Sequence, residues 1–528
     1  MSVGASASRG SSDLALLPCP MVDLIGNDAA GAEDVPLRER VIGGASGASR
    51  GGETADLDAW LAAEDFAERL ASWFGARMVP DRRWLVLALD RDVAEIDALL
   101  SQQVNAILHA PAFQRMEARW RGLKHLTEVA EEAPLARIRV LPASWSEVTR
   151  DLDRAFDFDR SQLFSKIYTE EIGMLGGEPF GLLIGDYEIQ HRPTDDHPSD
   201  DVAALKSLAM IAAAAFVPMV MGASPRLFQL DGFSALGRPF DLRAVFRQVE
   251  YQRWQSMREG EETRFIGLVL PRVLVRLPYV FDPTRRDGFR FEETVHAARG
   301  ADHLWGNAAI TFGAVVLRAF ANFGWFADIR GAARDELRGG LVWDLPVASY
   351  ATDKAGIAVK PSMEALLSDT QEKDLSDLGF IALRKVPFSD YSVFYANQSI
   401  QVPPRFDRPL ANINARLSGM LQYMLCVSRF AHYVKLMGRT FIGTMQTADE
   451  VQAALQSWLM NYCVGSDDAP LETKARHPLR EASVEIREVP GKAGAYSCVL
   501  FLRPHFQLDD IATGFRLVTQ LAPAANAA

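Results

Sequence analysis

The residues best equipped for chemistry lie in a short acidic loop. The segment HRPTDDHPSDD at 191–201 combines imidazole and carboxylate side chains, which are ordinary ligands of divalent cations. The candidate ligands are His191, Asp195, Asp196, His197, Asp200 and Asp201. An acidic segment interrupted by Pro193 and Pro198 is more often a solvated connection than a metal site, so we predict a loop and no metal here.

Other patterns of catalytic residues are missing from the sequence. It has no HExxH helix, which would place two imidazoles on one face for zinc, no GxxxxGK[ST] phosphate loop and no GxSxG nucleophile elbow. His432 and Lys435 lie three residues apart in a predicted helix, but no nucleophile accompanies them, so a core histidine is the simpler interpretation. We therefore predict no catalytic residue and no cofactor.

The densest run of charges lies within WQSMREGEETRFIGLVLPRVLVRLPY at 254–279. Charges of both signs packed this closely usually form ion pairs on a surface or between subunits. We predict such a network at Arg258, Glu259, Glu262 and Arg264, as possible interface residues. The alternative is a soluble enzyme that uses the cluster from Arg258 to Arg264 for acid and base chemistry, together with residues distant in sequence.

Composition limits the function before any motif is considered. The chain has 528 residues, of which 48% are hydrophobic and 23% charged, as in ordinary globular proteins. The formal charge is 56 − 68 = −12, which disfavours a nucleic-acid binder. Four cysteines without CxxC spacing favour a reducing compartment. We expect a cytoplasmic protein with no nucleic-acid partner.

Membrane insertion and export are also disfavoured. The first twenty residues contain an apolar patch that is short, is interrupted by proline and has no basic segment before it, unlike a signal peptide. The longest apolar run, LAMIAAAAFVPMVM at 208–221, is shorter than the roughly 20 residues needed to span a bilayer. We predict a buried core helix there and no membrane partner.

The N-terminal part should be flexible at first and then helical. Residues 1–55 are rich in Gly, Ala and Ser and poor in large apolar groups, which predicts a disordered tail. Apolar residues at helical spacing predict an amphipathic helix over 56–76. A longer helix is predicted over 90–109, with Asp90 as its N-cap and Pro111 after its end.

The middle of the chain predicts a mixed α/β fold. Short strand-like runs at 136–143, 181–189, 265–271 and 273–281 alternate with longer helical patterns such as 308–323. Beyond them, long helices are predicted over 411–436 and 448–462.

The C-terminal segment changes to a period of two, which indicates strands. Apolar residues alternate with polar ones over 484–489 and 496–502, with the turn segment PGKAG between them, which predicts a hairpin. A third alternating run covers 515–521. Free edges of such strands invite pairing with other chains. The residues that carry the pattern are Val484, Ile486, Tyr496, Cys498, Leu500, Leu502, Phe515 and Leu517.

Several long motifs are spread across about 104–521, among them VNAILHAPAFQRMEARWRGL, GGEPFGLLIGDYE, the stretch at 254–279, FGWFADIRG and NARLSGMLQYMLCVSRFAHYVK. They continue through ARHPLREASVEI and LRPHFQL. In this order, the motifs resemble the large subunit of the contractile sheath of bacterial type VI secretion systems, the TssC (VipB) family. The resemblance implies a contractile-tail-sheath-like fold with long C-terminal helices and a linking sheet.

The resemblance also implies a mechanical function. Family members pair with a small sheath subunit, TssB (VipA), and polymerise with it and with further copies of themselves around a tube of Hcp rings. The sheath, which sits on a baseplate, contracts and drives the tube into a target cell, and the ATPase ClpV later disassembles it. The C-terminal strands of the large subunit pair with strands from small subunits, which implies linking strands at 484–489, 496–502 and 515–521. The alternative is an internal sheet whose edge is covered by helices of this chain.

The sequence departs from the family pattern at three places. The family has a helix recognised by ClpV near the N-terminus, whereas the comparable stretch here, DLALLPCPMVDLIGN, contains Pro18 and Pro20, which oppose a helix. The stretch at 330–347 is longer and more charged than the family pattern, and the stretch at 360–380 retains only part of the family pattern. A second hypothesis is therefore a divergent paralogue that regulates or caps the sheath without polymerising. For domains, we predict a tail at 1–55, a sheath region at 56–400 and a C-terminal sheath domain at 401–528.

Overall fold

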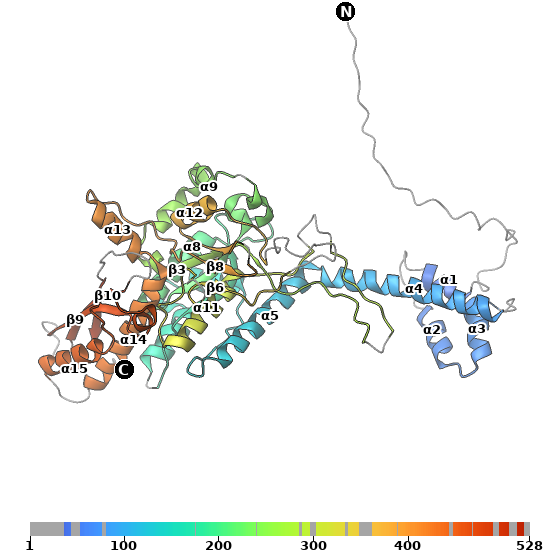
Figure 1. Cartoon of the computed structure of the whole chain (residues 1–528), viewed down its shortest axis with the longest axis horizontal. Helices are drawn as coiled ribbons and strands as arrows, with labels where there is room; N and C mark the ends of the chain where they lie inside the picture. The colour runs from blue at the N-terminus through green and yellow to red at the C-terminus, as the bar shows by residue number, and fades with distance from the viewer. Residues whose placement is uncertain are drawn as a thin grey trace, which may run out of the picture. The chain divides into compact units, whose positions relative to one another are not determined.

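The computed structural model describes most of the chain in two compact units (Figure 1). The first unit comprises residues up to 104 together with 281–291, and the second comprises 105–280 and 292 onward. The stretch compared with the ClpV-binding helix and Val489 lie outside the described residues. The described ranges are 36–43, 53–75, 81–174, 176–238, 240–284, 288–295, 302–332, 336–347, 362–387, 389–442, 447–466, 468–488, 496–505 and 515–521.

The first unit is helical. Its elements are α1 (Leu37–Gly43), α2 (Glu53–Ala62), α3 (Phe66–Phe74) and most of α4 (Arg82–Leu108). Helix α4 begins eight residues before the predicted N-cap, so Asp90 lies inside the helix. The predicted tail at 1–55 contains the described helix α1, whose Leu37 is buried. The predicted helix over 56–76 is two helices, because Asp65 caps a new one by accepting a hydrogen bond from the Ala67 amide.

A buried carboxylate joins the helices of this unit. The Asp92 side chain on α4 is 2% exposed and accepts two hydrogen bonds from Arg38 Nε of α1, at 2.7 and 2.8 Å. It also accepts a hydrogen bond from Trp73 Nε1 of α3 at 3.0 Å. The Trp73 ring packs against Trp60 of α2 at a centroid distance of 5.2 Å. One acidic side chain therefore holds together helices that are far apart in sequence.

The second unit is built on a six-stranded sheet in the order β1-β2-β3-β7-β8-β6. The first four strands are parallel, whereas β8 is antiparallel to both β7 and β6. The helix α8 (Asp201–Ala215) connects the parallel strands β1 and β2, as βαβ units require. The strands are β1 (Leu183–Ile189), β2 (Met219–Ala223), β3 (Ile266–Leu270), β6 (Leu341–Val342), β7 (Phe380–Lys385) and β8 (Ser392–Phe394).

Both faces of this sheet are buried at its centre, which explains why the central strands β2 and β3 contain only apolar residues. Alternate residues enter different hydrophobic clusters: Leu268 and Leu270 of β3 contribute to one and Val269 to the other. The first cluster includes α8 and the C-terminal helices, and the second includes α11 (Ala308–Phe323). Helix α11 packs against α5 (Pro111–Glu131), and Gly122 of α5 permits this close approach, since a Cβ there would lie 2.7 Å from Ile310.

Short elements surround this framework. They are α6 (Trp145–Arg154), η2 (Phe158–Arg160), α7 (Gln162–Phe164), η3 (Ser165–Gly173), η4 (Pro225–Phe228), η5 (Phe233–Gly237), α9 (Leu242–Phe246), η6 (Val249–Tyr251), α10 (Gln252–Arg258), η7 (Glu261–Phe265), β4 (Val273–Leu274), β5 (Trp305–Gly306) and α12 (Asp369–Asp377). The predicted mixed α/β class is confirmed, although the predicted strand over 136–143 is irregular and the predicted strand over 273–281 is limited to the two residues of β4. The apolar run at 208–221 is the end of α8 followed by β2, because Pro218 prevents one continuous helix.

The C-terminal part contains α13 (Pro409–Ser418), α14 (Leu421–Ile442), α15 (Ala448–Met460) and α16 (Leu471–Arg476). The predicted single helix over 411–436 is wrong, since α13 and α14 are separated at Gly419 and Met420. At this break the Leu421 amide donates to Asn397 O at 2.7 Å, and the Ser399 amide donates to Gly419 O at 3.0 Å. Backbone bonds to a distant segment thus replace the helical hydrogen bonds.

Candidate functional site

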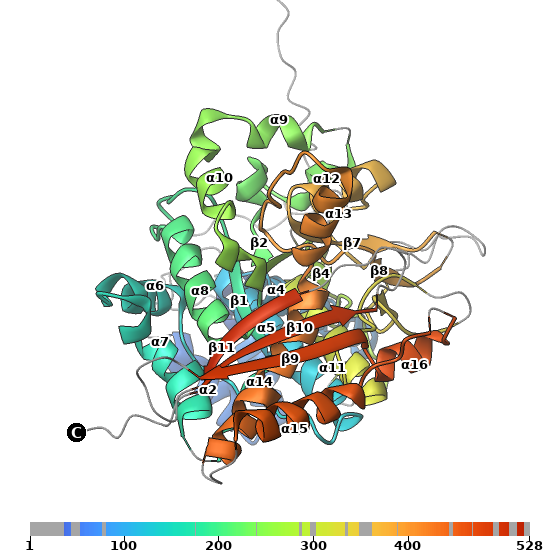
Figure 2. The ribbon, with the colours of Figure 1, turned by 90° about the vertical axis from the view of Figure 1, so that its left-hand side faces the viewer.

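The three C-terminal strands form one antiparallel sheet in the order β11-β10-β9 (Figure 2). They are β9 (Leu479–Glu488), β10 (Tyr496–Pro504) and β11 (Phe515–Leu521), so the hairpin and the third strand predicted from the sequence are both present. The register places Leu500 of β10 between Val484 of β9 and Leu517 of β11. The structure therefore brings the eight predicted strand residues into one sheet.

The inner face of this sheet is part of the hydrophobic core. Val484 and Ile486 are 6% and 9% exposed, and Cys498, Leu500 and Leu502 are fully buried. All five belong to the cluster that contains residues of α14 and α15. Tyr496, Phe515 and Leu517 lie on the strands, but their side chains are outside the described part of the chain. The described apolar side chains hold the sheet on its helices, and contacts with another chain are left to the edges or the outer face.

The described outer face carries polar side chains together with two apolar residues of β10, the half-buried Val499 and the exposed Phe501. Ser483, Glu485 and Arg487 alternate with the buried residues of β9 and are exposed, and Arg487 donates through Nε to Glu485 at 2.8 Å. Phe501 of β10 is 37% exposed on this face. This distribution is what a sheet with one buried face requires.

Two glutamines of α15 contact the free edge of β9, and the sequence analysis missed them. Gln452 and Gln456 are four residues apart and therefore project from the same side of the helix. They make hydrogen bonds to the backbone of β9 at Ala482, Val484 and Ile486. Their spacing was the available signal, but nothing in the sequence says which strand lies opposite them.

The charged segment at 258–264 divides between core and surface. Arg258 is 3% exposed and donates through Nε to Ile400 O at 2.6 Å, and burial lowers its pKa to about 10. Glu259 and Glu262 are exposed, and Arg264 forms an ion pair with Glu261 at 3.3 Å. Arg258 is therefore not a surface residue of the described chain, whereas the other three predicted interface residues are accessible.

A buried ion-pair network does occur within the 254–279 stretch, at Arg276. Its guanidinium lies 2.6 Å from Glu293 and 2.7 Å from Glu117, and its side chain is 8% exposed. His109 Nε2 lies 3.2 Å from Glu293. Two carboxylates hold the pKa of Arg276 above its usual value despite burial. This network connects α5 to the segments after β4 and before β5, so its role is structural.

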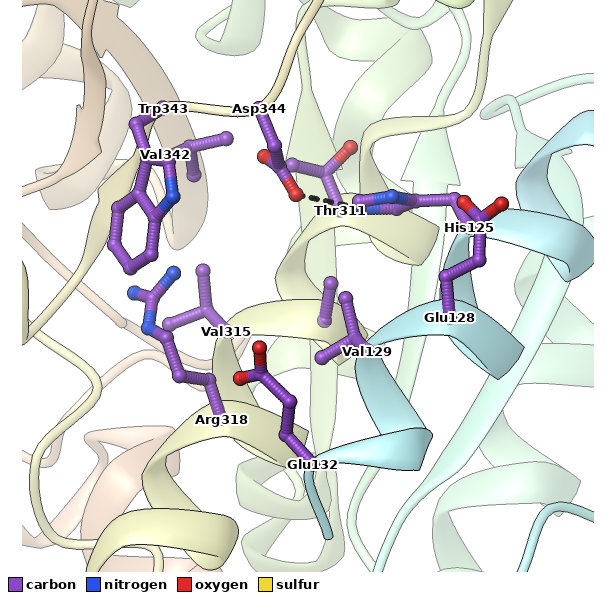
Figure 3. A pocket seen from close by; sticks show the side chains of 11 residues that line it. His125, Glu128, Val129, Glu132, Thr311, Val315, Arg318, Val342, Trp343 and Asp344 are labelled. Carbon is purple, nitrogen blue, oxygen red and sulfur yellow. Dashed lines mark ion pairs between the residues drawn. The ribbon is translucent and has the colours of Figure 1, made fainter.

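A cavity of about 340 Å³ lies between α5, α11 and the segment after β6 (Figure 3). Arg318 lines it, stacks on the Trp343 ring at 4.0 Å from the centroid, and donates to Gly339 O at 3.1 Å. Burial lowers the pKa of Arg318 to about 10. Across the cavity, His125 lies 3.3 Å from Asp344. The residues of the 258–264 cluster are not part of this lining, so the cavity gives no support to an enzyme site there.

The two titratable groups noted on α14 are core residues. His432 is 6% exposed and donates through Nε2 to Ala215 O at 2.9 Å, and burial lowers its pKa to about 4. Lys435 lies over the rings of Phe216 and Tyr168, and burial lowers its pKa to about 8. The hydrogen bond of His432 and the ring contacts of Lys435 explain the positions of both side chains as core residues, and no substrate is needed to explain them.

The side chains of the acidic loop at 191–201 also form hydrogen bonds and ion pairs with other residues of the same chain. His197 Nε2 lies 2.8 Å from Asp201, whose other oxygen accepts the Gln190 amide at 3.0 Å. Asp200 caps α8 and pairs with Arg253 at 2.6 Å. Within the described residues, no group of three His, Cys, Asp or Glu side chains is arranged to hold a metal ion. None of the described helices combines the length and the apolar character that crossing a membrane requires.

Comparison with known proteins gives consistent matches along the chain. A family described as EvpB/VC_A0108, tail sheath N-terminal domain, matches residues 90–401. A second family, described as EvpB/VC_A0108, tail sheath gpW/gp25-like domain, matches residues 410–521. The chain is also similar to the type VI secretion system sheath protein TssC1 of Pseudomonas aeruginosa, with 38% identity over 445 residues, covering 84% of this chain and 87% of that protein.

Proposed function

The chain belongs to the EvpB/VC_A0108 (VipB) family of tail sheath proteins, and from this we propose that it polymerises with the small sheath subunit TssB into a contractile sheath around an Hcp tube. The observation that carries the proposal is the match of both tail sheath domains, in chain order, over 90–401 and 410–521. A cytoplasmic location follows from this function, with the baseplate and ClpV as further partners.

The C-terminal sheet supports the proposal because it offers a means of linking subunits. A strand added to a sheet edge makes a row of main-chain hydrogen bonds that depends little on side-chain identity. Such a linkage can persist while the bodies that it connects change their packing. A repeated interface between different surfaces builds an open helical filament when its rotation does not close into a ring. We therefore assign the linking function to β9, β10 and β11.

Exposed charges near the start of β3 provide a second contact surface in this proposal. Glu259, Glu262 and Arg264 are available to ion pairs with a neighbouring subunit, whereas Arg258 is enclosed by its own chain. Contraction requires two packings of similar free energy, and ion pairs at accessible positions can exchange partners between such packings.

Co-expression with TssB tests the proposal. We expect tubules in electron micrographs and a stable complex in size-exclusion chromatography. A stable heterodimer that binds sheath but never forms tubules would support the capping or regulatory paralogue instead. A monomer indifferent to TssB would refute membership of a working sheath.

Deletion of residues 513–528 tests the linking strands. The deletion removes β11, so we expect tubules to be lost while the body remains folded. Normal polymerisation without these residues would show that the terminal sheet is an internal element. Circular dichroism of the deleted protein is the control for folding.

A further inference from the structure

The cavity beside α5 combines a buried apolar lining with acidic side chains at its opening. Ala314, Val315 and Val342 line it and are buried, whereas Glu132 and Asp344 are exposed. Figure 3 shows Glu132 and Asp344 on opposite sides of the cavity. A volume of about 340 Å³ is near the lower end for ligand pockets, so the cavity suits one large side chain better than a whole cofactor.

Arg318 and Trp343 form a wall of this cavity that favours an aromatic occupant. The Arg318 guanidinium lies 4.0 Å from the centroid of the Trp343 ring, and its hydrogen bond to Gly339 O at 3.1 Å holds it there. Guanidinium and indole groups are planar, and aromatic rings stack on both. A further ring can therefore pack against this pair inside the cavity.

The exposed side of α5 carries a surface of complementary kind. Trp120 and Met116 are 68% and 48% exposed, and their spacing of four residues places them on one side of the helix. Two exposed arginines, Arg115 and Arg119, lie next to them in the sequence. Tryptophan and arginine are enriched among the residues that contribute most to binding, and these residues typically fill pockets of the partner.

Trp120 does not project toward the cavity of its own chain. A helix turns by about 100° per residue, so Trp120 and the cavity-lining Val129, nine residues later, project from opposite sides of α5. The protruding tryptophan and the cavity are therefore two different surfaces of one chain.

The charges of α5 follow an order that helix stability does not explain. Its exposed basic residues Arg115, Arg119 and Lys124 precede its exposed acidic residues Glu128 and Glu131. The helix dipole favours the reverse order, yet α5 has no acidic residue in its first turn and no basic residue in its last. This order makes the first part of α5 electrostatically complementary to the end of α5 in another copy.

Two of these charges are available for a contact between copies. Arg119 pairs with Asp186 at 2.9 Å, whereas Arg115 forms no ion pair with any described residue. At the cavity, Asp344 lies 3.3 Å from His125, whereas Glu132 likewise has no ion-pair partner within the described part of the chain.

We propose that copies of this chain join head to tail through α5, with Trp120 of one copy in the cavity of the next copy and Arg115 paired with Glu132 at its opening. A protrusion and a cavity at different places on one chain form a heterologous interface, which repeats along a filament. This inference rests on the proposed function and adds to it a direct contact between large subunits.

Substitution of Trp120 is the direct test. In co-expression with TssB, sedimentable tubules should fall at least tenfold for Trp120→Ala while the heterodimer still forms, because Trp120 lies on the surface of the folded chain. Phe156→Ala is the matched control, since this aromatic side chain is fully exposed and lies outside the proposed contact, and its tubules should stay within twofold of wild type. Full assembly of Trp120→Ala, or equal losses in the two variants, would overturn the inference.

An exchange of charges identifies the two partners of the ion pair. Arg115→Glu and Glu132→Arg each place like charges at the contact, which is unfavourable, so each should lower the yield of tubules at least fivefold. The double variant restores opposite charges between copies and should recover at least half of wild-type assembly. A structural role of either residue within its own chain gives no such recovery, so a double variant as defective as the single variants would contradict the pairing.

Hydroxyl-radical oxidation of the wild-type chain distinguishes the occupants of the cavity. Trp120 should be oxidised as rapidly in the heterodimer as in the free chain, and at least fivefold more slowly in tubules. Protection already present in the heterodimer would show that the small subunit covers Trp120, and would overturn the assignment to a second copy. Tubules in which Trp120 is oxidised at the rate of the heterodimer would overturn this inference and leave the proposed function intact. A wild-type chain that forms no tubules with TssB would overturn the proposed function, and this inference with it.

Discussion

Replacing Leu500 with alanine tests how the terminal sheet is held on the body. Leu500 is fully buried at the centre of β10, where it packs in the same cluster as residues of α14 and α15. Removal of a buried leucine side chain costs about 2–5 kcal/mol, depending on how far the cavity collapses. Its neighbour Phe501 is 37% exposed on the opposite face, so Phe501→Ala should cost less than about 1 kcal/mol.

Native-state hydrogen exchange measures this difference locally, which suits a chain too large for a single two-state transition. For Leu500→Ala, the protection of amides in 496–504 should fall by about 30-fold to about 4,000-fold, since 1.4 kcal/mol corresponds to a factor of ten. For Phe501→Ala it should fall by less than about fivefold. Equal losses in the two variants, or a larger loss for Phe501→Ala, would refute the assignment of the inner face.

Three further outcomes follow from buried groups. Asp92→Ala should destabilise the first unit by about 3–5 kcal/mol because it leaves buried donors unpaired. Glu95→Ala removes a side chain that is 43% exposed and should cost less than about 1 kcal/mol. Rates of limited proteolysis compare the two variants, and similar rates would contradict the assigned role of Asp92. The Cys498 thiol, whose pKa burial raises to about 11, should resist iodoacetamide below pH 9 until denaturant is added, and rapid labelling in native buffer would contradict its burial. Burial lowers the pKa of His432 to about 4, below the unfolded value of about 6.5, so the unfolded chain binds the proton first. The free energy of unfolding of the region around α14 should therefore fall by about 2 kcal/mol between pH 7.5 and pH 5, as measured by native-state hydrogen exchange of the α14 amides. His432→Gln should remove that part of the pH dependence, and an unchanged pH dependence would refute the prediction.

The terminal hairpin was predictable because its pattern is local. Val484 and Ile486 on one strand, and Cys498 and Leu500 on the next, alternate with more exposed residues at the period of a strand with one buried face. The turn residues between them indicate that the strands are consecutive. The two strand segments and the turn between them are enough to predict the hairpin, so rules that use only neighbouring residues suffice.

The break between α13 and α14 was not predictable from the same kind of pattern. Apolar residues continue at helical spacing through Gly419 and Met420, and a single glycine is tolerated within helices. The helix is interrupted because the backbone of a separate segment, at Asn397 and Ser399, forms hydrogen bonds with Leu421 and Gly419. These tertiary hydrogen bonds outweigh the local preference for a continuous helix, and the spacing of apolar residues in the sequence does not reveal them.

Arg258 shows the same limit at the level of a single side chain. Its neighbours are charged and hydrophilic, so its segment is typical of a surface. Its guanidinium instead lies against Gly379 and bonds to Ile400 O, residues more than a hundred positions away. A Cβ at Gly379 would lie 2.8 Å from Arg258 Nη2, so a glycine there makes room for the buried arginine. The hydrogen bonds of Gln452 and Gln456 to β9 were likewise not predictable, because the sequence does not show which strand lies opposite α15.

Burial of both faces of the central sheet has a mechanical consequence. Bending β3 would compress one hydrophobic cluster and stretch the other, because Leu268 and Val269 belong to different clusters. Close-packed interiors resist such changes in volume, so the sheet is stiff in both directions. In the contractile sheath that we propose, force that enters through the terminal sheet would be transmitted across this block with little elastic loss, and the compliance would reside in the links between subunits.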